Sequence, residues 1–466
     1  MLGMGNMRQW LMNISLVGGW FPAAAFAVVA VLSVTLLVSA AVSKRDGRIL
    51  ATVLPIGVAA VSGMIGYVVA WLLSDVFVVF GVGLGSRVMS WVAAGFAIAG
   101  FAIVHIVLSR GMMRVAAAIL TVFAILAAAI GIDQSYGEYA TIGSLFGEDS
   151  YSQADLTGLA KRKDLITVAQ WRKKAANGTI RNIPANGTVN KIDIPATKSQ
   201  FEARKALVYL PPAALADSKR KPALPVVLML SGQPGSPGRV FQAGGIQTMM
   251  DGYAKTHDGL APIVIAADQL GADSHNTLCV DSKVYGNALT YLTQDVVDWV
   301  KTNLPAAQDA KDWAIAGFSQ GATCSLQIGV NHPDLFGTMI PTDSEIKPTN
   351  GSRQEMIDRF FDGDTTAYEN QVPVNAIRNH APTHQMLIIG AGEKDTTSIR
   401  NVKTIAPVAA KAGMRVAAVE SSGNAHDWHA VQDVLRYGLA VFGHDTGLDG
   451  ANPNLSDYPN LKRITI

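Results

Sequence analysis

Long apolar stretches dominate the first 132 residues. Four of them, at residues 20–43, 49–73, 88–109 and 115–132, approach or exceed the roughly 20 apolar residues needed to cross a bilayer. Buried helices of a soluble protein keep a polar face toward water, and these almost uncharged segments have none. Residues 1–132 are therefore predicted to form four transmembrane helices. The first segment is expected to be retained rather than cleaved as a signal peptide, because further spans follow it.

The pattern changes after Ile132. Residues 133–186 are polar and contain turn-like Asn-Gly pairs, which predicts a juxtamembrane linker. From residue 187 to residue 466, apolar runs of strand length alternate with segments of helical spacing, as in residues 291–304. The predicted strands are 188–195, 204–212, 224–232, 261–268, 312–319, 338–344, 385–395 and, as the last one, 414–421. This alternation predicts an α/β domain with a mostly parallel, doubly wound sheet.

Charges in the short loops predict how the spans are oriented. The first and third loops carry the positive residues Lys44, Arg45, Arg48, Arg110 and Arg114, whereas the second carries Asp75 and Arg87. Because positive residues stay on the cytoplasmic side, both termini and the α/β domain are expected outside the cell membrane. Arg8 alone opposes this multi-pass, extracytoplasmic arrangement.

Composition narrows the class of protein further. The formal net charge is only +2, and no basic patch with interleaved aromatic residues stands out, so nucleic-acid binding is not expected. The two cysteines, Cys279 and Cys324, would be free thiols in a reducing compartment and could form one disulfide in an oxidising one. Their spacing does not decide between these alternatives.

A candidate nucleophile lies where a predicted strand meets a predicted helix. Gly317-Phe318-Ser319-Gln320-Gly321 has the Gly-x-Ser-x-Gly pattern of a nucleophile elbow, a turn so tight that side chains two positions before and after the serine would clash. The strained serine would project its hydroxyl clear of the sheet, at the N-terminus of a helix. Ser319 is therefore predicted to be a catalytic nucleophile.

A serine needs a base and an orienting acid, and in this fold the acid and then the histidine follow the serine. Gly392-Glu393-Lys394-Asp395 matches a Gly-x-x-Asp acid loop, which favours Asp395, with Glu393 as the alternative and Asp343 and Glu345 as weaker candidates. After the final predicted strand, Gly423 and Asn424 allow a turn before His426. His426 is preferred over His429, which falls in the first turn of the next helix.

The developing oxyanion needs hydrogen-bond donors. One is the backbone N–H of Gln320, and the other is expected from the glycine-rich segment after the third strand, at Gln233, since Pro234 has no N–H. Pro382 separates His380 from His384 and spoils a helical metal-binding pair. No metal and no cofactor are expected.

The segments 204–212, 226–236, 291–300, 317–322 and 426–431 resemble the putative-esterase branch of the α/β hydrolases, which includes esterase D-like enzymes and mycolyltransferases. The His-x-Trp pattern of His426 and Trp428 is typical of that branch. The resemblance covers about residues 190–442 and implies a serine hydrolase or acyltransferase with Ser319, Asp395 and His426 as its triad. Ser231, Pro234 and Val431 replace residues that mycolyltransferases carry there, which argues against trehalose as the acceptor.

Three functions follow from the combination of membrane helices and hydrolase pattern. The first is a membrane-anchored, extracytoplasmic serine esterase acting on a lipid or cell-envelope ester. The second is an acyltransferase using the same acyl-enzyme, and the third is a non-catalytic membrane adaptor. Residues 343–380 form an insertion that is expected to act as a lid, where Phe360, Phe361 and Tyr368 would line an acyl path or pack the lid's own core. The sequence does not determine the oligomeric state.

Overall fold

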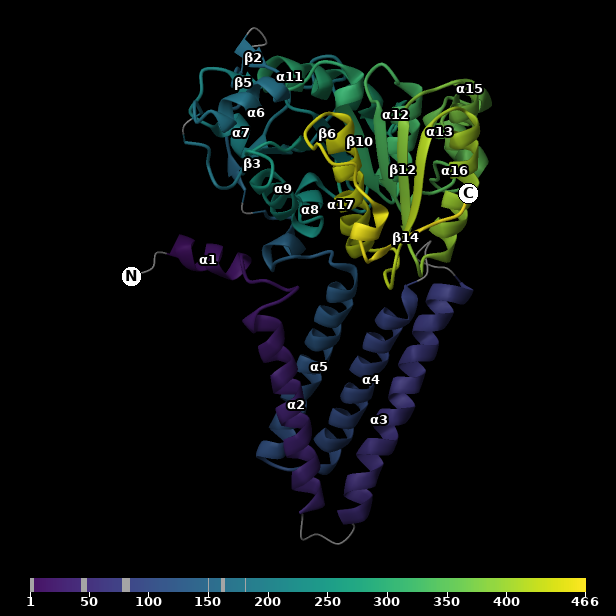
Figure 1. Cartoon of the computed structure of the whole chain (residues 1–466). Helices are drawn as coiled ribbons and strands as arrows, with labels where there is room; N and C mark the ends of the chain where they lie inside the picture. Colours follow the sequence, from purple (N-terminus) through teal and green to yellow (C-terminus); the bar gives the residue numbers. More distant parts are fainter. Residues whose placement is uncertain (1–3, 43–47, 78–83, 150, 161–163, 181) are drawn as a thin grey trace. The chain divides into compact units, whose positions relative to one another are not determined.

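The computed structural model describes residues 4–42, 48–77, 84–149, 151–160, 164–180 and 182–466 (Figure 1). These residues form two compact units. The helical unit comprises residues 1–148 and the short segment 425–427, and the sheet unit comprises residues 149–424 and 428–466.

Among the described residues, four helices of the helical unit are long and apolar enough to cross a membrane, which confirms that the four predicted segments form candidate membrane helices. They are α2 (Trp20–Ala41), α3 (Arg48–Trp71) with its π-helical continuation η1 (Leu72–Val76), α4 (Gly85–Leu108) and α5 (Met112–Tyr136). The shorter helices of this unit are α1 (Met4–Met12) and the 3-10 turn η2 (Gly143–Phe146). Lys44 and Arg45, two of the charges on which the predicted orientation rests, lie outside the described residues.

Small residues let these helices pack closely. A Cβ at Gly100 of α4 would lie 2.4 Å from the hydroxyl oxygen of Ser62 on α3, so only glycine fits there. Leu36, Ala102 and Leu120 are fully buried between helices. Most other apolar side chains of these helices are exposed, as expected for surfaces that face lipid.

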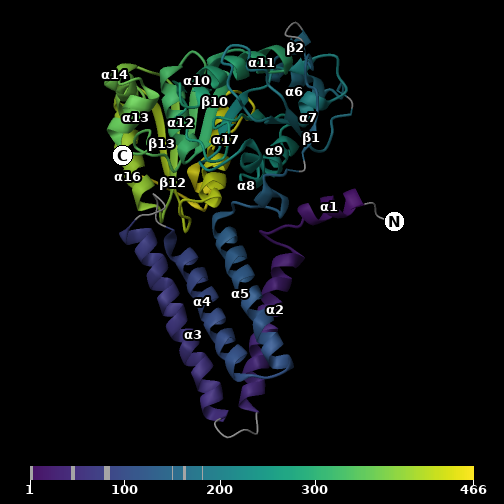
Figure 2. The same ribbon diagram turned by 180° about the vertical axis from the view of Figure 1, so that it is seen from behind.

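In the described residues, ten strands of the sheet unit form one sheet in the order β1-β3-β4-β7-β6-β10-β11-β12-β13-β14 (Figures 1 and 2). The strands from β7 to β13 in that order run parallel, while β3, β4 and β14 make antiparallel pairs. Their bounds are β1 (Ser152–Gln153), β3 (Thr188–Ile192), β4 (Ala206–Leu210), β6 (Val226–Leu230), β7 (Ile263–Ala266), β10 (Trp313–Phe318), β11 (Thr338–Thr342), β12 (Met386–Gly392), β13 (Arg415–Ser421) and β14 (Leu461–Arg463). The predicted mostly parallel sheet is confirmed.

Helices cover both faces of this sheet. Ile315 and Leu228 face a core shared with α11 (Val296–Asn303), α12 (Gln320–Asn331), α15 (Pro373–Asn379) and α16 (Thr396–Lys411). Ala314 and Val227, one position away, face a second core with α8 (Pro237–Ala243), α9 (Ile246–Lys255) and α17 (Trp428–Asp445). Because successive strand residues point to opposite faces, the continuous apolar runs of the central strands fill both cores.

The remaining elements of the sheet unit are short. They are β2 (Leu165–Ile166), which pairs with β5 (Lys221–Pro222), β8 (Asp281–Ser282), which pairs with β9 (Gly286–Asn287), and the helices α6 (Val168–Ala176), α7 (Pro212–Leu215), α10 (Ala288–Thr290), η4 (Tyr291–Asp295), η5 (Ala310–Asp312), α13 (Arg353–Phe360), α14 (Thr365–Glu369) and η6 (Leu455–Asp457).

The expectation that residues 414–421 form the last strand is wrong. β14 follows and pairs with β13 in antiparallel fashion through Val419↔Arg463, Glu420↔Lys462 and Ser421↔Leu461. Only Leu461 of this short strand is buried. A three-residue edge strand with two basic residues lacks the apolar alternation by which strands are recognised in a sequence.

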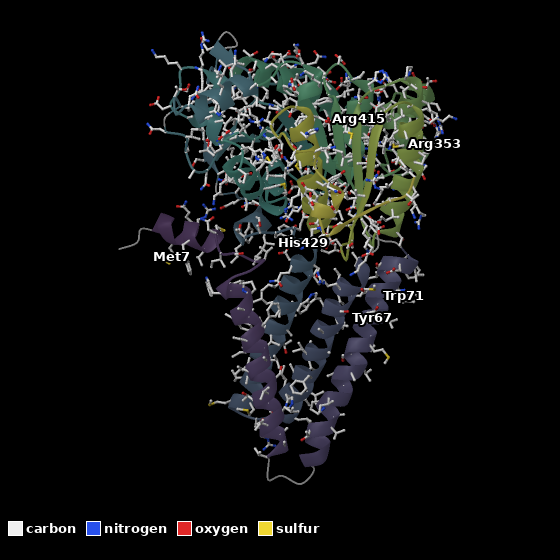
Figure 3. The ribbon with its side chains drawn as sticks, viewed as in Figure 1. Met7, Tyr67, Trp71, Arg353, Arg415 and His429 are labelled. Carbon is white, nitrogen blue, oxygen red and sulfur yellow. A yellow bond between two sulfur atoms is a disulfide. The ribbon has the colours of Figure 1, made fainter. Side chains whose placement is uncertain are left out.

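Two features left open by the sequence are resolved in the sheet unit. Cys279 and Cys324 form a disulfide, and both are fully buried. Phe360 and Tyr368 of the 343–380 insertion are buried in a small core with Leu278, so they pack the insertion's own interior rather than an acyl path. At the surface of the insertion, Arg353, which is labelled in Figure 3, forms an ion pair with Glu369.

Candidate active site

Ser319 lies at the turn between β10 and α12, in a backbone conformation that non-glycine residues rarely adopt. Its φ and ψ angles are 55° and −116°. Its backbone N–H donates to the carbonyl oxygen of Thr342 at 3.0 Å, which fixes the turn to the end of β11. Such strain is typical of functional sites, and it agrees with the elbow predicted from the sequence.

The two flanking glycines are required by contacts between backbone segments. A Cβ at Gly317 would lie 2.2 Å from the carbonyl oxygen of Gly321, and a Cβ at Gly321 would lie 2.3 Å from that of Ser231. β10 and β6 pair with Gly317 opposite Leu230, so the first turn of α12 lies directly against the end of β6. The elbow is thereby packed against the segment that follows Ser231.

Asp395 is the N-cap of α16, three residues after the end of β12. Its Oδ1 accepts hydrogen bonds from the backbone N–H groups of Thr397 and Ser398, at 3.1 and 3.0 Å, and its Oδ2 accepts one from the Ser398 hydroxyl at 2.6 Å. The side chain is 8% exposed. These bonds hold the carboxylate in one orientation at the C-terminal end of the sheet.

His426 lies in the loop between β13 and α17 and is half-buried. One of its ring nitrogens and one carboxylate oxygen each from Asp395 and Asp343 lie within 4.8 Å of one another. Asp343, a weak candidate by sequence, follows β11 with a φ of 55°, and its Oδ1 accepts the N–H of Gly392 at 2.9 Å. Two buried carboxylates therefore lie near the imidazole; such a group has the donors to hold a cation as well as to orient a base.

Glu393, the alternative acid, is engaged elsewhere. Its carboxylate accepts hydrogen bonds from the Lys462 ammonium at 2.8 Å and from the Gly423 N–H at 2.7 Å. The bond from Lys462 and then the one from Gly423 lower the pKa of Glu393. Glu393 thus fastens the loop before His426 to β14, and the geometry favours Asp395 as the orienting acid.

The loop that carries His426 is anchored from α17. Asp433, 7% exposed, accepts hydrogen bonds from the Ser421 hydroxyl at 2.7 Å and from the Asn424 side chain at 3.2 Å. Trp428, two residues after His426, packs against Phe318 of the elbow with ring centroids 5.0 Å apart. His429 is the second residue of α17, in its first turn as expected (Figure 3).

The segments predicted to supply the oxyanion donors are neighbours of the elbow. Gln320 is the first residue of α12 and is 7% exposed. Gly232, just before Gln233, is so close to Ser319 that a Cβ added to it would lie 3.6 Å from the Ser319 Cβ. Sequence reasoning missed Gln269, which follows β7 and contacts both segments, because one glutamine after a strand carries no motif.

Fold and elbow together define a serine hydrolase of the α/β class. A family model described as "Putative esterase" matches residues 198–438, more than half of the chain. An uncharacterized protein of Corynebacterium glutamicum is 32% identical over 333 residues, which cover 70% of this chain and 74% of that protein. The chain belongs to the putative esterase family.

Two solved structures of similar fold each cover little more than half of this chain. An S-formylglutathione hydrolase from Agrobacterium tumefaciens is 16% identical with a TM-score of 0.46, covering 57% of this chain and 99% of that chain. MPT51 (FbpC1) of Mycobacterium tuberculosis is 14% identical with a TM-score of 0.40, covering 55% of this chain and 98% of that chain.

The close backbone contact at Gly321 generates a first prediction. Gly321→Ala is expected to destabilise the sheet unit by about 1–3 kcal/mol, because α12 must move away from the end of β6, and to abolish esterase activity. Thermal unfolding and hydrolysis of p-nitrophenyl butyrate measure both effects. Gly252→Ala in α9, where a Cβ meets nothing within 4 Å, is the control and is expected to leave activity unchanged. Equal behaviour of the two variants would contradict the prediction.

A second prediction separates the acids. Asp395→Asn is expected to lower kcat by about 10³- to 10⁴-fold, because the imidazole loses its orienting carboxylate. Glu393→Gln is expected to keep kcat near the wild-type value, since its partners are Lys462 and Gly423. The same steady-state assay is applied to Asp343→Asn. A larger loss of kcat in Asp343→Asn than in Asp395→Asn would show that Asp343, at the end of β11, is the orienting acid.

Proposed function

We propose that this protein is a membrane-anchored, extracytoplasmic serine esterase that acts on a lipid or cell-envelope ester through an acyl-enzyme. The observation that carries the proposal is the strained Ser319 on a glycine-flanked turn at the C-terminal end of β10. Asp395 follows the parallel strand β12 at the same end of the sheet and lies close to His426. Membership of the esterase family supports the reaction class.

In the proposed mechanism, His426 removes the proton from the Ser319 hydroxyl while the oxygen attacks the ester carbonyl carbon. The C=O π electrons move to oxygen, and the backbone N–H groups of Gln320 and Gln233 stabilise that oxyanion. When the tetrahedral intermediate collapses, the bond to the leaving alkoxide breaks and His426 returns the proton to it. Water then repeats the sequence on the acyl-enzyme and releases the free acid. Asp395 orients the imidazole throughout and stays ionised.

Two independent features support an extracytoplasmic sheet unit. Arg110 and Arg114 follow α4 and begin α5, whereas the loop after α3 is bordered by Asp75 and Arg87, and positive loops stay in the cytoplasm. The disulfide between Cys279 and Cys324 requires an oxidising compartment, which lies across the membrane from the cytoplasm.

The membrane helices support a substrate held in or near the bilayer. One helix would be enough to tether a soluble esterase, whereas four candidate spans with largely exposed apolar side chains add a large lipid-facing surface. Tyr67 and Trp71 project from α3 with 40% and 44% of their side chains exposed (Figure 3), as aromatic residues do near a membrane interface. An ester carried by a lipid or by the cell envelope fits a membrane-embedded enzyme better than a freely diffusing ester does.

Covalent labelling tests the proposed nucleophile. A fluorophosphonate probe is expected to label the wild-type protein in membranes and to leave Ser319→Ala unlabelled, because only an activated hydroxyl attacks the phosphorus atom. Ser325→Ala is the matched control, since Ser325 is a fully buried serine on the same helix that bonds only the local carbonyl of Ala322. Wild-type protein that resists the probe would favour the adaptor alternative.

The product formed from membrane lipids distinguishes hydrolysis from acyl transfer. Hydrolysis is expected to release free acid, whereas acyl transfer would give a new ester.

Cysteine labelling tests the orientation. Both native cysteines are paired and buried, so a single introduced thiol reports its own position. In intact cells a membrane-impermeant maleimide is expected to label Asp298→Cys, whose side chain is 60% exposed on α11, and not Met112→Cys, whose side chain is 81% exposed at the start of α5. Met112→Cys becomes labelled after permeabilisation. The reverse pattern would place the sheet unit in the cytoplasm.

A further inference from the structure

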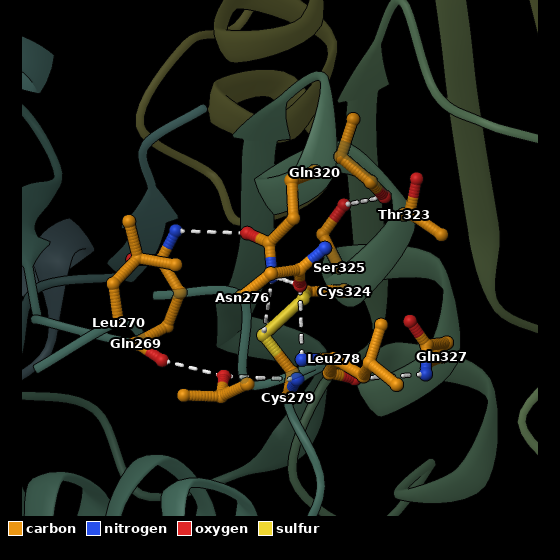
Figure 4. Close-up of a disulfide and its surroundings, with 12 residues drawn as sticks. Gln269, Leu270, Asn276, Leu278, Cys279, Gln320, Thr323, Cys324, Ser325 and Gln327 are labelled. Carbon is orange, nitrogen blue, oxygen red and sulfur yellow. Dashed lines mark hydrogen bonds between the residues drawn. A yellow bond between two sulfur atoms is a disulfide. The ribbon is translucent and has the colours of Figure 1, made fainter. Parts of the chain in front are cut away.

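A buried amide bridges the two segments beside the elbow. Gln269 is completely buried and follows β7 by three residues. Its side-chain NH2 group donates to the main-chain oxygen of Ser231 at 2.7 Å. It also donates to the side-chain oxygen of Gln320 at 3.2 Å (Figure 4). Both partners are acceptors, so the NH2 group must face them and the orientation of the amide is fixed.

These two partners belong to the two segments that supply the proposed oxyanion donors. Ser231 stands two residues before Gln233, and Gln320 carries the other donor on its own backbone. The two N–H bonds of a carboxamide lie in one plane with a fixed angle between them. A single side chain therefore sets the separation of the two segments at the point where they approach Ser319.

Each segment is also held from its far side. The Gln320 side chain donates to Asn276 Oδ1 at 3.2 Å, and Asn276 donates in turn to the carbonyl oxygen of Thr349 at 2.9 Å. Cys324, one helical turn after Gln320, is bonded to Cys279 of the same loop as Asn276 (Figure 4). The first turn of α12 is thus fastened to the loop that follows Gln269.

The segment after β6 is fastened by the neighbour of Gln269. Asp268 is completely buried and pairs with Arg204, whose guanidinium donates to the carbonyl oxygen of Gly235 at 2.9 Å. Consecutive residues after β7 therefore fix the two ends of residues 231–235, Gln269 directly and Asp268 through Arg204.

Stability alone does not account for an amide at this position. Within the described part of the chain, Gln269 Oε1 is buried and has no hydrogen-bond partner. A buried polar atom in that state costs about 1–3 kcal/mol. Because Gln327 of α12 also has a buried Oε1 without a partner among the described residues, what distinguishes Gln269 is that its NH2 group joins the two donor segments.

We propose that Gln269 is a positioning residue that sets the spacing of the two oxyanion donors, the backbone N–H groups of Gln233 and Gln320. This inference rests on the proposed esterase function. Donors must lie 2.7–3.1 Å from the developing oxyanion, so small displacements weaken transition-state binding more than substrate binding. Gln269 touches neither substrate nor Ser319 in this role; it acts through Ser231 and Gln320.

The test replaces the amide by an apolar side chain of similar length. Gln269→Met, in the full-length protein in detergent or membranes, is expected to lower kcat for p-nitrophenyl butyrate by about 10- to 100-fold, less than the roughly 10²- to 10³-fold that follows loss of a donor. KM is expected to stay near the wild-type value. Binding of phenylboronic acid, whose serine adduct is a tetrahedral anion, is expected to weaken by a similar factor.

A matched control lies on the same helix as Gln320. Gln327 is 1% exposed, donates to the carbonyl oxygen of Leu278 at 3.3 Å and, like Gln269, has a buried Oε1 without a partner among the described residues. It contacts neither donor segment in the hydrogen bonds described. Gln327→Met removes an equivalent buried amide and is expected to keep kcat and boronate affinity near wild type.

The outcomes separate this inference from the proposed function. A wild-type protein that neither reacts with the fluorophosphonate nor hydrolyses the ester contradicts the esterase function itself. A reactive wild type, with Gln269→Met retaining kcat and boronate affinity, overturns only the role of Gln269. Equal losses in Gln269→Met and Gln327→Met also overturn it, because they would show a general effect on folding; thermal unfolding of both variants checks this directly.

Discussion

Backbone meets backbone at the turn that carries Ser319, and no side chain fits between the two segments. The carbonyl oxygens of Leu230 and Ser231 occupy the space that a Cβ at position 321 would take, at 2.6 and 2.3 Å. The chain must turn sharply at Ser319 to pass this contact. The contact also brings residues 232–235 beside the first turn of α12. One steric constraint thus shapes the turn of the proposed nucleophile and brings together the segments that are proposed to bind the oxyanion.

A residue at a φ of 55° is strained by about 1–3 kcal/mol, and its surroundings must enforce that conformation. Here the enforcement comes from burial: every residue of α12 from Gln320 to Val330 is buried, and the Ser319 N–H is bonded to the end of β11. The disulfide adds a covalent restraint one helical turn later. The cysteines are 45 residues apart, and closing a loop of that length lowers the entropy of the unfolded chain. On this basis the disulfide stabilises the folded state by about 4 kcal/mol.

The elements that the sequence predicts are those with a local signal. Uncharged length identifies the spans, apolar runs identify the central parallel strands, and glycine spacing identifies the elbow at Ser319. Elements whose signal is tertiary are missed. β14 is three residues long and largely charged, and it exists only because β13 offers an edge. The closeness of Asp343 to Asp395 depends on the pairing of β11 with β12, and the role inferred for Gln269 depends on β7 lying beside β6.

Compartment and site geometry are linked through the disulfide. Cys279 lies in the loop that begins at Gln269 and includes Asn276, the residue that holds the Gln320 side chain. In a reducing compartment this loop would be joined to α12 by hydrogen bonds and packing alone, and each such hydrogen bond contributes only about 0.5–1.5 kcal/mol. A chain inserted with the sheet unit on the cytoplasmic side would keep its sheet, its elbow and its acid loop. It would lose the covalent restraint nearest to the proposed oxyanion donors, so membrane orientation affects the active site as well as access to substrate.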